Sequence, residues 1–240
     1  HEGQCAQLVR HMYGTRAAAD GWQEEYSTFL VGTLKFAQGT ASPCVFRHGS
    51  RELVMTVHGD DFTTVGPKED LDWLETQMQE HDELTIQPRM GPGPQDAKEA
   101  VILNRIIRWA GSGIEYEADL RQAEKLIAEC GMTDTHTVAT PGLRLSYDQL
   151  EKDAVLPAHL HTAFRGSSAR ANYLAADRLG CQFAAKEVCR WMSNPTEAAW
   201  RALKRICRYL VGPPRMIFHY RWQTVEHVDV HTDTDWAGCP

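Results

Sequence analysis

The first third of the chain switches between helical and strand-like spacing of its hydrophobic residues. Over residues 16–36 the large residues recur every three or four positions, which predicts an amphipathic helix. Residues 52–58 and 62–65 read as strands on either side of Gly59-Asp60-Asp61, which predicts a β-hairpin with these three residues at its tip. A second amphipathic helix is predicted over 67–80. We therefore expect an antiparallel hairpin with both helices packed on one face of its sheet.

The rest of the chain changes from strand-rich to helical after residue 118. Further strands are predicted at 44–46, 84–87, 101–109, 113–116, 216–220 and 228–232. Helices are predicted at 119–130, over most of 170–192, and from 193–197 to about 211. Residues 90–94 and 140–157 read as irregular segments, with His159 and His161 in a loop. This order predicts an α+β fold with a strand-rich layer first and helices after it.

Composition narrows the class of protein. The 240 residues are 42% hydrophobic and 24% charged, which is typical of a globular protein of one large or two small domains. No apolar run approaches the ~20 residues that a membrane-spanning helix needs, and the polar start is not a signal peptide. The seven cysteines form no Cys-x-x-Cys pair, so neither a zinc site nor a disulfide framework is expected. We expect a cytoplasmic or nuclear protein that is not secreted.

Two groups of acids are candidates for metal chemistry. Asp60 and Asp61 are adjacent carboxylates on a predicted turn, and hard oxygen ligands of this kind hold divalent cations. Asp233 ends a predicted strand and is followed by Trp236 and Gly238, which would suit a metal-dependent nuclease. Taken alone, each is a weak signal, because Gly-Asp-Asp is also an ordinary turn and aspartate is common at strand ends.

A third candidate is a stripe of cations on the helix that ends near residue 211. Arg201, Lys204, Arg205 and Arg208 lie at i, i+3, i+4 and i+7, on one face of a helix. We expect these four cations to share an exposed face. The apolar face is expected to be buried through Trp200, Leu203, Cys207 and Leu210. The cationic face could neutralise phosphates of a nucleic acid. The competing interpretation is a solvated outer face, and the net charge of −7 counts against a freestanding nucleic-acid binder.

The order of several motifs is more specific than any one of them. In chain order they are Met12-Tyr13-Gly14-Thr15-Arg16 with Trp22, Ser42-Pro43-Cys44-Val45-Phe46, His58-Gly59-Asp60-Asp61, Gly131-Met132, Thr140-Pro141, Phe164-Arg165-Gly166-Ser167 with Tyr173-Leu174, Lys204-Arg205-Ile206-Cys207-Arg208-Tyr209-Leu210, and Asp233-Thr234-Asp235-Trp236-Ala237-Gly238. Together they resemble the reverse transcriptase of copia-type (Pseudoviridae) retrotransposon polyproteins, running into the start of ribonuclease H. Both ends of the chain are expected to be cuts in a longer protein.

The resemblance implies a domain order. Residues 1–118 would be a partial reverse-transcriptase palm, an antiparallel sheet with packed helices, whose upstream part is missing. Residues 119–160 would be a thumb-like segment and 161–222 a connection. Residues 223–240 would hold the first strand of a truncated ribonuclease H domain.

The resemblance also implies an activity, RNA-directed DNA polymerisation with two Mg²⁺ ions. Asp60 would be a direct metal ligand and Asp61 the second acid, while Asp233 would be a metal ligand of the nuclease. Arg16 and the four cations of the stripe would bind nucleic acid. The implied partners are an RNA or DNA template-primer, deoxynucleotides, and the rest of the polyprotein: integrase and fingers upstream, ribonuclease H downstream. The implied location is a cytoplasmic virus-like particle or the nucleus, with no membrane.

Departures from the family pattern leave an alternative open. Ala17-Ala18-Ala19-Asp20 replaces Gln-Ala-Pro-Arg, His58 replaces a tyrosine, and Gly59 replaces a bulky residue. The family's third metal-binding aspartate would lie upstream of this chain, so we expect the chain alone to be inactive. The alternative is a non-catalytic or domesticated remnant that acts as a nucleic-acid-binding or scaffold domain. The retained Asp60-Asp61 pair counts against long neutral decay.

Overall fold

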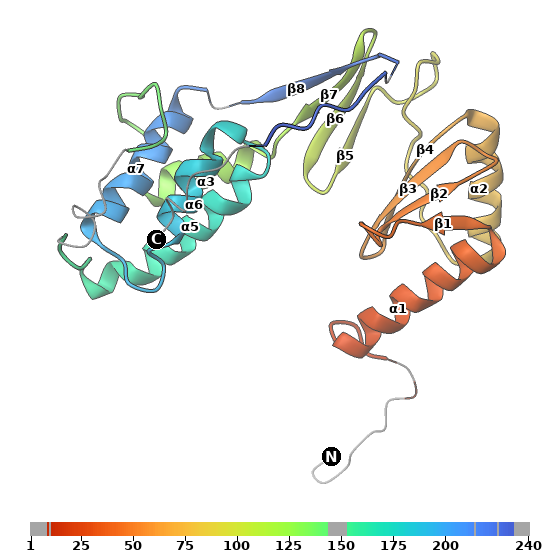
Figure 1. Cartoon of the computed structure of the whole chain (residues 1–240), viewed down its shortest axis with the longest axis horizontal. Helices are drawn as coiled ribbons and strands as arrows, with labels where there is room; N and C mark the ends of the chain where they lie inside the picture. The colour runs from red at the N-terminus through yellow and green to blue at the C-terminus, as the bar shows by residue number, and fades with distance from the viewer. Residues whose placement is uncertain (1–8, 10, 144–152, 214, 225, 233–240) are drawn as a thin grey trace. The chain divides into compact units, whose positions relative to one another are not determined.

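The chain folds as two compact units, residues 1–87 and 88–240 (Figure 1). The computed structural model describes residues 9, 11–143, 153–213, 215–224 and 226–232. Each unit contains one four-stranded antiparallel sheet together with helices, so the expected mixed α+β class is confirmed. Among the described residues, no helix is both long enough and apolar enough to span a membrane.

The first unit is a sheet with a helix before it and a helix after it. Its strands follow the order β1-β2-β3-β4, and every neighbouring pair is antiparallel. The elements are α1 (Arg16–Thr28), a π-helical turn (Phe29–Thr33), β1 (Phe36–Gln38), β2 (Val45–His48), β3 (Leu53–His58), β4 (Asp61–Val65) and α2 (Lys68–His81).

The core of this unit lies on one face of the sheet. Alternate residues of β3 are buried, whereas the residues between them are exposed. Helix α1 and the π-helical turn after it contribute Tyr26 and Leu30 to this core, and α2 contributes Leu74 and Met78. Burying each of these large side chains contributes roughly 1.5–3 kcal/mol. Both helices therefore cover the same face of the hairpin, as the sequence predicts.

The second unit joins a separate sheet to a group of helices. Its strand order is β5-β6-β7-β8, again antiparallel throughout. The elements are β5 (Glu99–Ile102), β6 (Arg105–Ala110), β7 (Gly113–Glu117), α3 (Leu120–Glu129), short 3₁₀ turns (Ala158–Leu160 and Leu179–Cys181), α5 (His161–Ala175), α6 (Gln182–Cys189), α7 (Glu197–Val211) and β8 (Ile217–Arg221).

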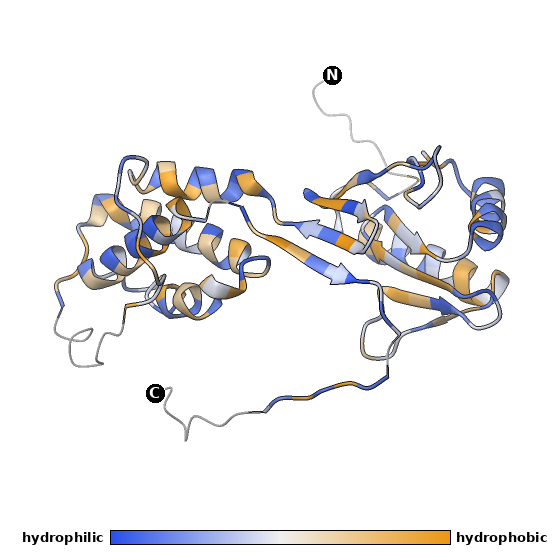
Figure 2. Ribbon diagram, turned by 90° about the horizontal axis from the view of Figure 1, so that it is seen from above, coloured by the Kyte–Doolittle hydropathy of each residue, from blue (hydrophilic) through white to orange (hydrophobic). Residues whose placement is uncertain are grey.

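The helices of the second unit share one hydrophobic core. Hydrophobic and hydrophilic residues alternate along each helix (Figure 2), and α3, α5, α6 and α7 each turn an apolar side toward the others. Leu126, Phe164, Leu203, Ile206 and Leu210 are among its most deeply buried side chains. The apolar face of α7 is thus fixed by packing, which carries most of the stability of a helix in a protein.

Strand β8 closes the second sheet from the far end of the chain. It pairs with β7, so that Ile114 lies opposite Tyr220 and Tyr116 opposite Phe218. Gly113 permits this close approach, because a Cβ atom there would lie 2.1 Å from the carbonyl oxygen of Tyr220. The C-terminal part of the described chain is thereby bound to the strands that precede α3.

Several predicted elements differ from the structure. No strand forms at 84–87 or 228–232, and the predicted strand 101–109 is two strands joined by a turn at Leu103-Asn104. Helix α5 begins at His161, where a loop was expected.

Candidate functional site

The Asp60-Asp61 pair lies at the tip of the β3–β4 hairpin. His58 and Asp61 form the last pair of the ladder, which leaves Gly59 and Asp60 as a two-residue loop. Gly59 has φ +64°, whereas Asp60 is not among the described non-glycine residues with positive φ. A positive φ at the first loop position and a negative φ at the second is the pattern of a type II′ turn, which favours glycine first. The expected position of the pair is confirmed.

Both carboxylates are open to solvent. Asp60 and Asp61 are exposed, and neither side chain has a hydrogen bond or ion pair among the described residues. Adjacent carboxylates without a competing cation are suited to a divalent metal ion, which prefers hard oxygen ligands. The hairpin therefore exposes two adjacent carboxylates to solvent at its tip.

Helix α1 holds this tip from the core side. The indole Nε1 of Trp22 donates a hydrogen bond of 2.9 Å to the carbonyl oxygen of Gly59. The Trp22 ring also makes an edge contact with Phe62, at 6.2 Å between centroids, and Tyr26 makes another at 5.8 Å. One residue before Asp60 and one residue after Asp61 are thus both in contact with α1.

Arg16, predicted to bind nucleic acid, begins α1. Its guanidinium forms an ion pair of 3.7 Å with Asp20, one turn later, and both side chains are highly exposed. An exposed pair of this kind contributes at most about 1 kcal/mol. Asp20 is one of the departures from the family pattern, so the substituted position partly neutralises the cation that was expected to meet nucleic acid.

Two further predictions concern Asp233 and the apolar side of α7. Asp233 lies outside the described residues. The apolar side of α7 is oriented as predicted: Leu203, Cys207 and Leu210 are buried, and Trp200 is half-buried.

The cationic side of α7 is not a plain solvated face. Only Arg201 is exposed, and it pairs with Asp153 and Glu197. Lys204, Arg205 and Arg208 are half-buried, because the segment 132–143 lies over this side of the helix. The predicted exposure of all four cations was therefore wrong for three of them.

Carbonyl groups of that segment hold two of the arginines. Arg205 donates from Nε to the carbonyl oxygens of Thr140 and Gly142, at 3.1 and 3.0 Å, and Arg208 donates from Nε to His136 at 2.9 Å. The ammonium group of Lys204 lies over the Trp200 ring at 5.3 Å.

A hollow of about 660 Å³ opens beside these contacts. It is lined by all four cations of the stripe, with Asp134 as the acidic residue among its lining residues. The four cations are thus gathered around one hollow in a chain whose net charge is −7.

Sequence reasoning missed a group of potential metal ligands on the first unit. His81, at the end of α2, has Nε2 3.5 Å from Glu25 Oε1 and Nδ1 3.1 Å from Asp82 Oδ2. One nitrogen of His81 and one carboxylate oxygen each of Glu25 and Asp82 lie within 4.8 Å of one another, close enough to share one cation. No local signal could reveal the group, because Glu25 and His81 are far apart in sequence and meet only when α1 and α2 pack together.

Two polar clusters in the second unit were also missed. Glu117, at the end of β7, accepts from Arg108 at 2.6 Å and from Arg215 at 2.8 Å. The bonds from Arg215 and Arg108 lower the pKa of Glu117 to about 2, against the opposing effect of burial. Asp177 accepts from Arg105 at 3.0 Å and from the Tyr116 hydroxyl at 2.6 Å. The Glu117 cluster joins the second sheet to the segment after α7, and the Asp177 cluster joins it to the segment between α5 and α6.

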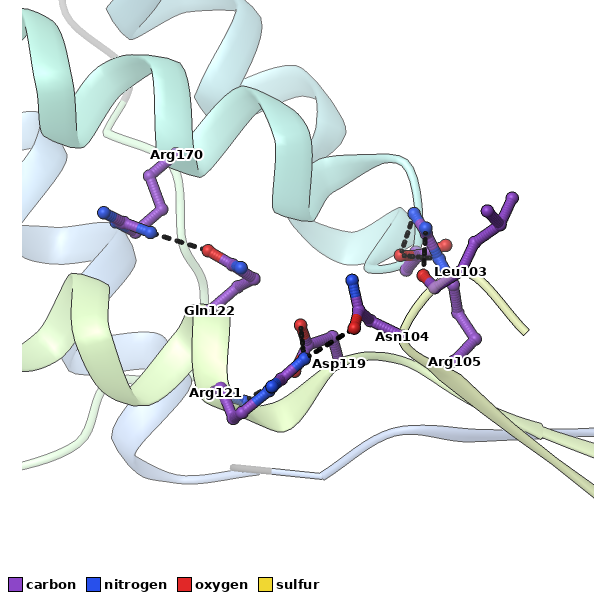
Figure 3. Close-up of polar contacts among 8 residues, drawn as sticks. Leu103, Asn104, Arg105, Asp119, Arg121, Gln122 and Arg170 are labelled. Carbon is purple, nitrogen blue, oxygen red and sulfur yellow. Dashed lines mark hydrogen bonds and ion pairs between the residues drawn. The ribbon is translucent and has the colours of Figure 1, made fainter. Parts of the chain in front are cut away.

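A third contact binds the β5–β6 turn to the start of α3. Figure 3 shows Arg121 directed toward both Asp119 and Asn104, with hydrogen bonds of 3.0 and 2.9 Å. Asp119 is also the N-cap of α3, and the Arg121 bonds lower its pKa. The turn and the helix start are therefore positioned together.

None of the described cysteines forms a disulfide. Cys130, Cys181 and Cys207 are buried and unpaired, while Cys44 is exposed. Contact with Cys130, together with burial, raises the pKa of the Cys207 thiol. The raised pKa lowers the thiolate fraction of Cys207 and with it the reactivity of this buried thiol.

Comparison with known proteins identifies relatives over nearly the whole chain. The chain is 27% identical to the retrovirus-related Pol polyprotein from transposon RE2 of Arabidopsis thaliana and 26% identical to that from transposon RE1, each over 96% of its length. It spans about 15% of the length of these relatives. Half of it is 32% identical to the uncharacterized mitochondrial protein AtMg00810 of the same plant, over 48% of that protein. No family model and no solved structure matches.

Proposed function

From the premise that the homologues of this chain are retrovirus-related Pol polyproteins of copia-like transposons, we propose that it is part of a reverse transcriptase, an RNA-directed DNA polymerase. One observation carries the proposal. Asp60 and Asp61 are two exposed carboxylates at the tip of a hairpin whose sheet is covered on one face by two helices. This arrangement agrees with the motif order that resembles a polymerase palm.

The residues at the tip fit a role in binding Mg²⁺. Asp60 serves as the direct ligand and Asp61 as the second acid of the pair, with two ions in the complete site. Bound Mg²⁺ would supply charge stabilisation while the primer 3′ hydroxyl attacks the α-phosphate of a deoxynucleotide. The hairpin fixes the spacing of the two acids, and α1 holds the loop that carries them.

The remaining segments take their proposed roles from the same resemblance. Residues 1–118 form the palm segment, 119–160 the thumb-like segment, 161–222 the connection, and 223–240 the start of ribonuclease H. Partners are the RNA or DNA template-primer, deoxynucleotides and the other Pol domains. The place of action is a cytoplasmic virus-like particle or the nucleus.

Primer extension tests the polymerase proposal. We expect a longer polypeptide of the parent, including the region upstream of this chain, to extend a primer with Mg²⁺. Asp60→Asn should lower the rate at least a hundredfold, because a metal ligand is lost. Asp72→Asn, on the surface of α2 and paired with Lys68, should leave the rate within twofold. An Asp60→Asn variant that extends primers normally would contradict the proposal. The 240-residue chain alone should extend no primer.

A second candidate function is a non-catalytic nucleic-acid-binding or scaffold domain. The Arg16–Asp20 ion pair favours it, because it partly neutralises a cation expected near the template. The same assay separates the two functions. A parent polypeptide that binds a primer-template duplex but never extends it would support the second candidate.

We propose that the cationic hollow beside α7 contacts the phosphates of the duplex. Lys204 provides the cleanest test, because its ammonium group lies over the Trp200 ring and has no hydrogen bond or ion pair among the described residues. Lys204→Ala should reduce the slope of log affinity against log salt by about 0.9, the value for one lost phosphate contact. Lys125→Ala, an exposed cation on α3, should leave the slope unchanged. Equal slopes for the two variants would mean that the hollow does not meet phosphates.

A further inference from the structure

We propose that Trp22 is a positioning residue for the Asp60-Asp61 hairpin, fixing the loop that presents the two acids. The inference rests on the proposed function, because the pair matters only if it binds metal. Trp22 itself touches neither carboxylate in the described contacts. Its contacts are with the residues on either side of the pair.

The first contact fixes the loop backbone. The Trp22 indole donates to the carbonyl oxygen of Gly59 at 2.9 Å, and this carbonyl belongs to the peptide group that joins Gly59 to Asp60. Fixing this oxygen fixes the orientation of the peptide plane. That plane contains the Cα atom of Asp60, so its orientation helps to set the direction of the Asp60 side chain. The loop needs such support, because Gly59 is exposed and a Cβ atom there would have no neighbour within 4 Å.

The second contact fixes the strand that follows. Phe62 comes directly after Asp61 and meets the Trp22 ring edge-on at 6.2 Å. Tyr26, one turn along α1, meets Trp22 at 5.8 Å and Phe62 at 5.8 Å. Three rings in mutual edge contact are a favourable aromatic arrangement. Asp60 and Asp61 are therefore flanked by two points that α1 holds in place.

A purely structural role for Trp22 makes a different prediction. If the residue only fills space, phenylalanine should replace it with a general loss of stability and no special effect at the tip. If its N–H positions the loop, phenylalanine keeps an aromatic ring in the core but removes the bond to Gly59. A net hydrogen bond of ordinary strength corresponds to about a three- to tenfold change in a local opening equilibrium.

Hydrogen exchange by NMR on the full 240-residue chain tests the positioning role. In Trp22→Phe, the Asp61 amide at the end of the ladder should exchange about three- to tenfold faster than in the wild type. The Met55 amide, in the middle of β3, should change less than twofold. Trp73→Phe is the matched control, because no hydrogen bond of the Trp73 indole N–H is among the described contacts, and it should leave Asp61 unchanged.

Two outcomes would overturn the inference: unchanged exchange at Asp61, or equal acceleration at Asp61 and Met55. If Trp22→Phe does not fold, 3-benzothienylalanine at position 22 repeats the test, since it keeps the ring shape and replaces N–H by sulfur. Mn²⁺ broadening of the Asp60 and Asp61 amides in the wild type reports separately on the metal role. Exchange therefore decides the positioning role even where the proposed function fails.

Discussion

Replacing Glu117 by Gln removes the negative charge at the centre of a buried ion cluster in the second unit. The side chain of Glu117 is 4% exposed and lies 2.6 Å from Arg108 and 2.8 Å from Arg215. Both arginines lower its pKa, from an ordinary value of 4.5 to about 2. That difference corresponds to roughly 3 kcal/mol of stability at neutral pH.

Glu117→Gln should lower the free energy of unfolding by somewhat less than this roughly 3 kcal/mol. Arg215 is half-exposed and can be solvated by water, and Arg108 keeps its second partner, Glu99, at 2.7 Å. Neither arginine is left as an uncompensated buried charge, which is the situation that costs about 3–5 kcal/mol. We therefore expect Glu117→Gln to lower the free energy of unfolding by about 2 kcal/mol at pH 7.

The pH dependence follows from the sign of the pKa shift. The pKa of Glu117 is lower in the folded state, so its contribution is complete above the unfolded-state value and is lost as the pH falls toward 2. The difference between wild type and variant should be constant from pH 8 to about 5. As the pH falls from about 4.5 to 2, this difference in the free energy of unfolding should shrink and then vanish.

Urea unfolding followed by NMR measures this difference. Because the chain has two compact units, a resolved amide of the second unit, such as that of Leu203, should be monitored. Glu115→Gln is the matched control, because Glu115 lies on the same strand with no ion pair among the described residues, and it should change stability by less than about 0.5 kcal/mol. A Glu117→Gln effect as small as the control, or one independent of pH down to 3, would refute the reasoning.

Three further substitutions test the backbone and the second cluster. Gly59→Ala should lower the stability of the first unit by about 1 kcal/mol in urea unfolding, because φ +64° strains any residue with a Cβ atom; no loss would argue against the left-handed loop. Asp177→Asn should cost about 2–3 kcal/mol in the same measurement on the second unit, since Asp177 is buried and bonded to Arg105; a loss below 0.5 kcal/mol would contradict that contribution. Gly113→Ala should detach β8, seen as faster hydrogen exchange at Tyr220, because the added Cβ would meet its carbonyl oxygen; unchanged exchange would show that the strands can separate without loss of pairing.

The first unit was largely predictable because its signals are local. The hairpin is marked by strand-like residues on both sides of Gly59, and the helices α1 and α2 by their three- and four-residue spacing. The predicted strand at 84–87 was wrong. Leu84 and Ile86 alternate in a strand-like way, but no strand of the described residues pairs with them, and a strand needs a partner for its backbone groups.

The β5–β6 turn gave almost no sequence signal. Leu103 and Asn104 have φ 48° and 65°, the pattern of a type I′ turn. Asparagine tolerates this conformation, but leucine rarely adopts it, so residues 101–109, rich in β-branched residues, were predicted as one strand. The turn is instead held from outside, since Arg121 bonds to Asn104.

Long-range contacts account for the other differences. The pairing of β7 with β8 and the bonds of Glu117 to Arg215 join residues about a hundred positions apart, and no periodicity within a segment encodes such partners. The stripe on α7 was placed on the correct side of the helix by its spacing. Only the fold reveals that Arg205 and Arg208 donate hydrogen bonds to carbonyl oxygens of the segment 132–143.

The most direct test of the central claim is to locate the divalent cation on this chain. Mn²⁺, a paramagnetic substitute for Mg²⁺, broadens the amide signals of residues close to its binding site. We expect the strongest broadening at residues 59–62, and we expect Asp60→Asn to abolish it while Glu25→Gln leaves it in place. Broadening centred on Glu25, His81 and Asp82, the other group of potential ligands on this unit, with none at Asp60 and Asp61, would contradict the claim that the hairpin tip is the metal site.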